Sequence, residues 1–192
     1  MRYDGHWTRA GGLYVKPQDT SFHDNAMPID TARCNSYWAD FIESLPVGDP
    51  RRLAKADAFG FGGHDELAEK LAALVLAGRK RATASLPVEY TSLGEPLPTA
   101  GDMSIILNGT GNPVAIIERT SVSVVPFDAV DAKFAAREGE GDASLAYWRE
   151  AHSWYFGEVC KRLGGKFESN TPVLCQCFTV VWPLAGRDAA AA

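Results

Sequence analysis

Hydrophobic side chains recur at helical spacing in three stretches of the chain. Hydrophobic residues that recur every three or four positions predict a helix over about residues 32–45. A leucine and valine stripe predicts a second helix that has Asp65 as N-cap, runs to Ala77 and is followed by a left-handed Gly78. A longer pattern predicts a third helix over about residues 143–163. We therefore expect three amphipathic helices, each with one face against a core.

Short runs of β-branched and aliphatic residues occupy much of the remaining chain. They predict strands over Met103–Asn108, Pro113–Thr120, Ser121–Pro126 and Val173–Val181, and a short helix is predicted over Phe127–Arg137. An Asn-Gly-Thr-Gly-Asn segment joins the first two strands as a hairpin loop. Helices and strands do not alternate regularly, which disfavours a doubly wound parallel sheet. We expect an α+β fold with a small, mostly antiparallel β-barrel, or a strongly bent sheet, and flanking helices.

One domain accounts for most of the 192 residues. Scattered glycine and proline without a period predict an irregular N-terminal extension over residues 1–32. Residues 33–184 are expected to form the domain, and residues 185–192 a flexible tail. The chain shows no signal peptide and no apolar run of about 20 residues, so we expect a cytoplasmic protein without a membrane span.

Charge and cysteine spacing narrow the class of function. A formal charge of −5 argues against a protein that coats nucleic acid through bulk positive charge. The four cysteines lack zinc-type spacing and are expected to be reduced core thiols. Neither a glycine-rich phosphate loop nor a metal-ligand cluster is visible, so we expect no cofactor and no metal.

The segment Gly78–Leu86 combines three cations with two hydroxyls directly after a predicted helix. Arg79 and Arg81 flank Lys80, and like charges disfavour the protonated form of a lysine. If Lys80 is also partly buried, its pKa could fall into the range of a general base. Thr83 follows three residues later, where a strand would turn it to the opposite face unless a turn intervenes. The alternative is an ordinary surface lysine.

Carboxylates and aromatic residues elsewhere supply further candidates. Glu118 ends an apolar strand, either as a solvated strand end or as a partner of Lys80 or of a substrate amine. Glu138-Gly139-Glu140-Gly141-Asp142 places three carboxylates on alternate positions, which could ligate a hard cation, although the EF-hand register is absent. The alternative is local structure, with Asp142 expected to cap the following helix. Trp148 and His152 lie one helical turn apart, either as core residues or to stack on a base.

Three of these segments together resemble the ASCH-domain family of the PUA-like superfamily, in its longer bacterial branch. They are Leu74–Leu86, Gly101-Asp102 at the start of a strand, and Glu138–Asp142 with Trp148 and His152 behind it. The resemblance covers about residues 33–183. It implies a small β-barrel with helices around it, a cleft beside the lysine-containing turn, and an association with RNA.

The resemblance also implies two kinds of enzyme. One branch of the family resembles an amidohydrolase that removes the acetyl group from N4-acetylcytidine with a Lys, a Thr three residues later and a Glu from a strand. Lys80 and Thr83 match that spacing, and Glu118 is the best-placed candidate for the Glu. If Glu140 rather than Glu118 approaches Lys80, the acidic role moves to Glu140. Another branch resembles ribonucleases.

We therefore expect a hydrolase that acts on a modified nucleoside or on RNA, with Lys80 as base, Thr83 as nucleophile or water positioner, and Glu118 as orienting carboxylate. Substrate contacts are expected from Arg81, Ser85, Glu140, Trp148 and His152. The alternatives are a non-catalytic module that binds nucleotides or single-stranded RNA, and a ribonuclease. The pattern leaves the oligomeric state open.

Overall fold

The computed structural model describes residues 8–10, 13–15 and 29–183, in two compact units. Unit 1 comprises residues 1–77, 101–118 and 179–192, and unit 2 comprises residues 78–100 and 119–178. Within the predicted N-terminal extension, β1 (Thr8–Ala10) pairs antiparallel with β2 (Leu13–Val15). The predicted tail over residues 185–192 lies outside the described residues.

Two α-helices of unit 1 begin where a side chain caps the first turn. The two helices are α1 (Thr31–Ser44) and α2 (Asp65–Leu76), and a 3₁₀ turn over Pro50–Leu53 lies between them in the sequence. In α1 the Asp30 carboxylate accepts the Arg33 N–H. In α2 the N-cap is His64, whose Nδ1 accepts the Leu67 N–H at 3.3 Å, and not the predicted Asp65. Asp65 already belongs to the helix, where its carboxylate complements the helix dipole.

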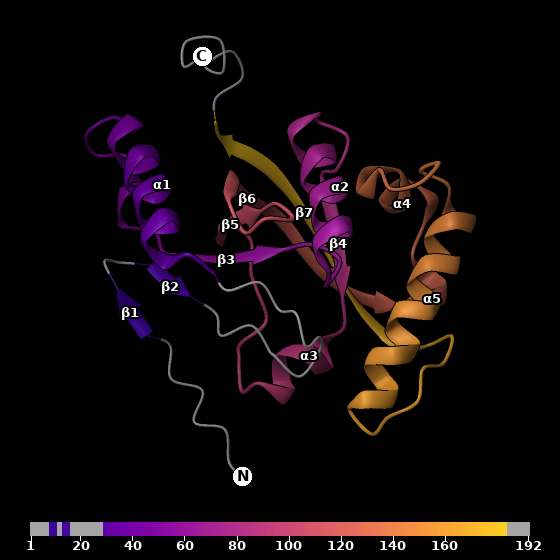
Figure 1. Ribbon diagram of the computed structural model, residues 1–192. Helices are drawn as coiled ribbons and strands as arrows, with labels where there is room; N and C mark the ends of the chain where they lie inside the picture. The colour runs from indigo at the N-terminus through magenta and orange to yellow at the C-terminus, as the bar shows by residue number, and fades with distance from the viewer. Residues whose placement is uncertain (1–7, 11–12, 16–28, 184–192) are drawn as a thin grey trace. The chain divides into compact units, whose positions relative to one another are not determined.

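Three strands of unit 1 lie side by side (Figure 1). β5 (Met103–Leu107) pairs in parallel with β3 (Ala56–Gly60) and antiparallel with the first half of β6 (Pro113–Pro126). The chain leaves β3 through α2 and then passes through residues 78–100 of unit 2 before it returns as β5, and a crossover connection is what parallel neighbours require. All five residues of β5 are buried, as expected of a central strand.

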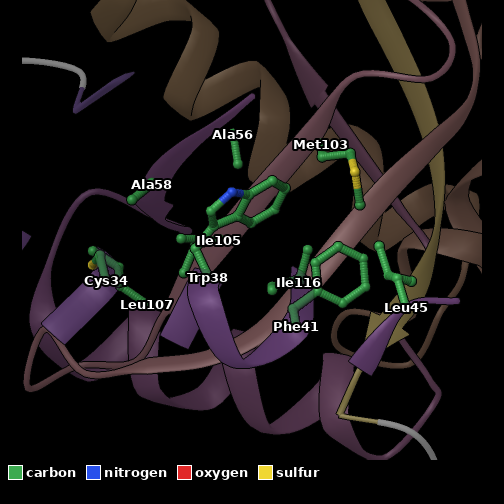
Figure 2. Packing of buried hydrophobic residues seen from close by; sticks show 10 residues of the cluster. All are labelled: Cys34, Trp38, Phe41, Leu45, Ala56, Ala58, Met103, Ile105, Leu107 and Ile116. Carbon is green, nitrogen blue, oxygen red and sulfur yellow. The ribbon is translucent and has the colours of Figure 1, made fainter. Parts of the chain in front are cut away.

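The core of unit 1 forms between α1 and the strands (Figure 2). Its buried residues are Cys34, Trp38, Phe41, Leu45, Ala56, Ala58, Met103, Ile105, Leu107 and Ile116. The Trp38 and Phe41 rings lie side by side in the view, with centroids 5.3 Å apart. The helical period in the sequence thus marks the face of α1 that packs on the sheet.

Unit 2 has its own helices, strands and core. It contains β4 (Ala82–Ser85), α3 (Pro87–Ser92), a 3₁₀ turn over Phe127–Ala129, α4 (Ala132–Glu138), α5 (Leu145–Arg162) and most of β7 (Pro172–Trp182). β4 pairs antiparallel with β7, and α4 contacts α5 (Figure 1). A buried cluster centred on Phe127, Trp148 and Phe156 includes Cys175 of β7. This cluster fixes α5 against one face of the β4–β7 pair.

The predicted α+β class is confirmed, whereas the predicted barrel is wrong. The strand order is β3-β5-β6-β7-β4, and within the described part of the chain β3 and β4 do not pair to close the sheet. The sheet is mixed and not mostly antiparallel, because the β3–β5 pair is parallel. Two predicted strands, Pro113–Thr120 and Ser121–Pro126, form the single strand β6. No described helix is long and apolar enough to cross a membrane.

The four cysteines are free thiols, and three of them are buried. Burial raises the pKa of Cys34 to about 11 and that of Cys175 to about 12. Both thiols are therefore protonated and weakly reactive at neutral pH. They pack as small apolar side chains.

Replacement of Phe41 by alanine tests the unit 1 core. Phe41 is 1% exposed, so Phe41→Ala is expected to lower the free energy of unfolding by about 3–5 kcal/mol. Urea denaturation measures this loss. Val47→Ala, at a side chain that is 99% exposed, is the control and should change the free energy by less than about 0.5 kcal/mol. Equal losses in both variants would contradict the assigned core.

Candidate functional site

The turn that carries Lys80 is held by backbone contacts within unit 2. The Arg81 N–H donates to the Arg137 carbonyl at 2.8 Å, and the Arg81 carbonyl accepts the Phe178 N–H at 2.9 Å. The turn is therefore joined to α4 on one side and to β7 on the other. The Arg81 guanidinium folds back onto the turn and donates to the Lys80 carbonyl at 2.8 Å.

The glycines of the Glu138–Asp142 run allow this loop to approach the lysine turn. Gly139 has a φ of +66°, and a Cβ there would lie 2.3 Å from the Arg79 carbonyl oxygen. Gly141 has a φ of +53°, and a Cβ there would lie 2.5 Å from the Tyr147 ring. Only glycine satisfies both the left-handed backbone and the close contact at these positions. The glycine spacing therefore serves the placement of the loop.

The residue that caps α5 differs from the prediction. Ser144 is the N-cap, and its hydroxyl accepts the Tyr147 N–H at 3.1 Å. The predicted cap, Asp142, instead accepts the Ser144 N–H at 2.8 Å and so shapes the loop before the helix. The hydrogen bond to Ser144 lowers the pKa of Asp142. Among the described residues, no group of three or more His, Cys, Asp or Glu side chains could hold a metal ion.

The Lys80 ammonium lies between two carboxylates of this loop. Its Nζ donates to Glu138 Oε2 at 2.9 Å and also to Glu140 Oε1. The side chains of Lys80 and Glu138 are each 1% exposed, whereas that of Glu140 is 19% exposed. One carboxylate thus anchors the lysine from inside the protein, and the other reaches it from the surface.

Glu138 is the centre of a wider buried network. Its Oε1 accepts the Trp148 indole N–H at 2.9 Å and lies 3.6 Å from His152 Nε2. The Trp148 and His152 rings stack with centroids 4.2 Å apart. His152 Nδ1 lies 2.9 Å from the Trp148 carbonyl, which only accepts, so this nitrogen carries a proton. The Lys80 ammonium, the Trp148 indole N–H and the edge of the His152 ring are therefore arranged around one carboxylate.

The protonation of Lys80 differs from the sequence-based expectation. Burial alone would lower the Lys80 pKa, but the charges of Glu138 and then Glu140 outweigh it and hold that pKa above its ordinary value. Burial would raise the Glu138 pKa, but Lys80 and then His152 hold it below its ordinary value. Lys80 and Glu138 are thus a buried ion pair. The expectation that the flanking arginines lower the Lys80 pKa is wrong.

The remaining predicted residues divide between the two units. Thr83 lies on β4 opposite Gln176 of β7, and Ser85, two residues on, shares its face. Both are half-buried. Glu118 belongs to unit 1, where it lies opposite Met103; the Arg51 pKa is raised mainly by the hydrogen bond with Asp49, to which the Glu118 charge adds. Trp148 is 2% exposed, so a base could stack on it only by displacing its neighbours.

The family model for the ASCH domain matches residues 57–182. This chain belongs to the ASCH-domain family. The crystal structure of an ASCH domain from Lactobacillus crispatus JV V101 is 34% identical to the chain, with a TM-score of 0.73 over 81% of this chain and 96% of that one. A protein of Enterococcus faecalis V583 is 35% identical, with a TM-score of 0.67 over 78% of this chain and 88% of that one. No curated protein matches the chain.

The sequence does not predict a site role for three polar residues that are buried in this ASCH domain: Glu138, Arg119 and Gln176. Glu138 was noted as part of the acidic run, but the end of a short helix gives no sign that its carboxylate turns inward. Arg119 and Gln176 are 6% and 2% exposed, and Arg119 Nε donates to Gln176 Oε1 at 2.7 Å. A charged residue directly after the apolar run that ends at Glu118 was the available signal for Arg119.

Replacement of Gly139 tests how tightly the loop of this ASCH domain is placed. Gly139→Ala is expected to lower the free energy of unfolding by at least about 1–3 kcal/mol, the cost of a strained left-handed backbone, with the clash against Arg79 in addition. Gly157→Ala is the matched control. Gly157 lies in α5 with open space around its Cβ, so alanine there should stabilise by about 0.5–1 kcal/mol. A Gly139→Ala variant as stable as the wild type would refute the close approach.

The buried ion pair also predicts a pH dependence of stability. Because the Glu138 pKa lies below its ordinary 4.5, its contribution is present above pH 4.5 and lost as the pH falls through the folded pKa. The Lys80 pKa lies above 10.5, so its contribution is complete below pH 10.5 and lost only as the pH rises through that raised value. Urea denaturation below pH 4.5 should therefore show a shallower acid decline for Glu138→Gln than for wild type. Glu150→Gln, at an exposed carboxylate of α5, should decline as wild type does.

Proposed function

We propose that this ASCH domain binds a nucleoside or single-stranded RNA and hydrolyses an amide on the base, as in N4-acetylcytidine. The observation that carries the proposal is the Lys80 ammonium, held by buried Glu138 and contacted by partly exposed Glu140. An oriented cation beside an accessible carboxylate is suited to acyl transfer, since one stabilises a developing oxyanion and the other accepts a proton.

The direction of the Lys80 pKa changes the roles within this reaction. A lysine whose pKa is raised is a poor general base, but its N–H groups can donate to the amide oxygen as negative charge develops. Glu140 then takes the acidic role in place of Glu118, because Glu140 is the partly exposed carboxylate that contacts the buried Lys80 ammonium. Thr83 is proposed to act as nucleophile or to position the attacking water.

The steps balance without a further reactant. Water, or the Thr83 hydroxyl followed by water, attacks the acetyl carbon and gives its proton to Glu140. The C–N bond then breaks, the proton passes to the departing amine of the base, and acetate is released. Arg81, Ser85 and His152 remain candidates for substrate contacts. Trp148 is proposed to hold Glu138 through its indole N–H rather than to stack on the base.

A non-catalytic module for RNA or nucleotides is the second candidate. The ion pair itself favours this function, because a lysine held in one place by two carboxylates can orient a bound ligand without taking part in a reaction. In that case cations such as Arg81 would supply the affinity, which should weaken with salt. The two functions differ in turnover and not in the location of the site.

Acetate release from N4-acetylcytidine tests the proposed reaction. The wild type should turn over, and Glu140→Gln and Lys80→Met should each lower kcat by at least about 100-fold, the lower limit for loss of a general acid or base. Glu150→Gln, on the exposed part of α5, is the control and should retain activity within about twofold, since it touches neither group. Thermal unfolding of each variant separates loss of activity from loss of fold.

Three results would contradict this mechanism. Wild-type activity that survives in Glu140→Gln but is lost in Glu118→Gln would return the acidic role to Glu118. Saturable binding of single-stranded RNA without acetate release would favour the binding module. Cleavage of the RNA that is lost in Lys80→Met would favour a ribonuclease.

A further inference from the structure

A row of polar side chains crosses three neighbouring strands of unit 2. Arg119 lies on β6, Gln176 on β7 and Ser85 on β4, and these strands are adjacent in the sheet. Arg119 Nε donates to Gln176 Oε1 at 2.7 Å, and Gln176 Nε2 donates to Ser85 Oγ at 3.3 Å. Arg119 is 6% exposed and Gln176 2%. A guanidinium and an amide are thus fixed beneath a hydroxyl.

The chemistry of the row fixes the direction in which its hydrogen bonds run. A guanidinium only donates, so the side of the Gln176 amide that faces Arg119 must be its oxygen. The amide nitrogen therefore faces Ser85, whose oxygen must accept. The Ser85 hydroxyl hydrogen is then directed away from Gln176. The row therefore ends in the Ser85 hydroxyl as a hydrogen-bond donor, and the buried Arg119 guanidinium lies behind it across Gln176.

The end of the row is reachable from solvent. Ser85 and Thr83 are half-buried and lie on the same face of β4, with Thr83 directly opposite Gln176 in the antiparallel register. The other face of this strand pair is covered, because Cys175 and Ala84 pack in the cluster around Phe156. Two hydroxyls therefore lie at the accessible edge of a buried guanidinium–amide pair, and one of them belongs to Thr83, the residue proposed to attack the substrate or to position water.

We propose that Arg119, Gln176 and Ser85 form a phosphate subsite, so that this ASCH domain binds a nucleotide or an RNA more tightly than a free nucleoside. Hydroxyl donors and a guanidinium are the groups that bind phosphate oxygens in proteins. Gln176 holds the guanidinium in one orientation, which lowers the entropy lost when an anion binds. The inference rests on the proposed function, since it concerns the same face as Thr83.

Calorimetric titration of the full chain with cytidine, cytidine 5′-monophosphate and a cytidine-containing trinucleotide tests the subsite. The wild type should bind at least one phosphorylated probe about tenfold or more tightly than cytidine, the gain expected of a charge-assisted contact. Preference for the monophosphate places a free nucleotide in the site, and preference for the trinucleotide alone places an RNA backbone there.

Two variants and a control connect this preference to the row. Gln176→Glu keeps the size of the side chain but sets a carboxylate on Arg119, which should compete with the phosphate, and Ser85→Ala removes the terminal donor. Both should bring the ratio of cytidine to phosphorylated-probe Kd to within about twofold of one, with the cytidine Kd little changed, because only the phosphate contact is lost. Ser123→Ala, on an exposed stretch of β6, should keep the wild-type ratio.

Either of two results would overturn the subsite: a wild type that binds no phosphorylated probe more tightly than cytidine, or a preference that survives in both variants. The acetate assay separates this outcome from that of the proposed reaction, because N4-acetylcytidine carries no phosphate. Turnover without phosphate preference refutes the subsite alone. Phosphate preference lost in the variants, without turnover, refutes the hydrolase and retains the subsite.

Discussion

The buried ion pair between Lys80 and Glu138 is the interaction on which the rest of unit 2 depends. Removal of two charges from water is unfavourable, and their attraction offsets it only when the remaining donors and acceptors are also satisfied. The structure meets this requirement with the Trp148 indole on the second oxygen of Glu138 and with Glu140 on the ammonium. Trp148 lies on α5 and Glu140 in the loop after α4, so the satisfied pair draws on contacts from two segments of unit 2.

This constraint explains the sequence around the pair better than metal binding or helix capping does. The loop after α4 must bring Glu138 and Glu140 to one ammonium, and it does so by laying Gly139 against the Arg79 backbone. The stacked rings of Trp148 and His152 then close the network from α5. The acidic Glu138–Asp142 run, whose sequence could suggest a cation-binding loop, therefore supplies the carboxylates that pair with a lysine. That lysine, Lys80, precedes Glu138 by 58 residues.

The sequence predicted those features that depend on local order along the chain. The face of α1 that carries Phe41 follows from the helical period, and Lys80 stood out because cations and hydroxyls follow a helix end. The open, mixed sheet was not predictable, because the parallel β3–β5 pair is decided by a crossover and not by either strand. Glu138 and Gln176 were missed for a related reason: inward orientation and register depend on distant partners.

The two carboxylates that hold Lys80 are not equivalent, and this inequality determines what chemistry the site can support. Glu138 is buried and also bound to Trp148, so it stays with the lysine when a ligand arrives. Glu140 is partly exposed and bound through its side chain from a loop, so a ligand oxygen can take its place on the ammonium. In the proposed reaction, Lys80 then stays charged and donates to the ligand, and Glu140 is the free carboxylate beside it. The proposed reaction would therefore obtain a hydrogen-bond donor, Lys80, and a base, Glu140, from one ion pair while the contacts of Glu138 stay unchanged.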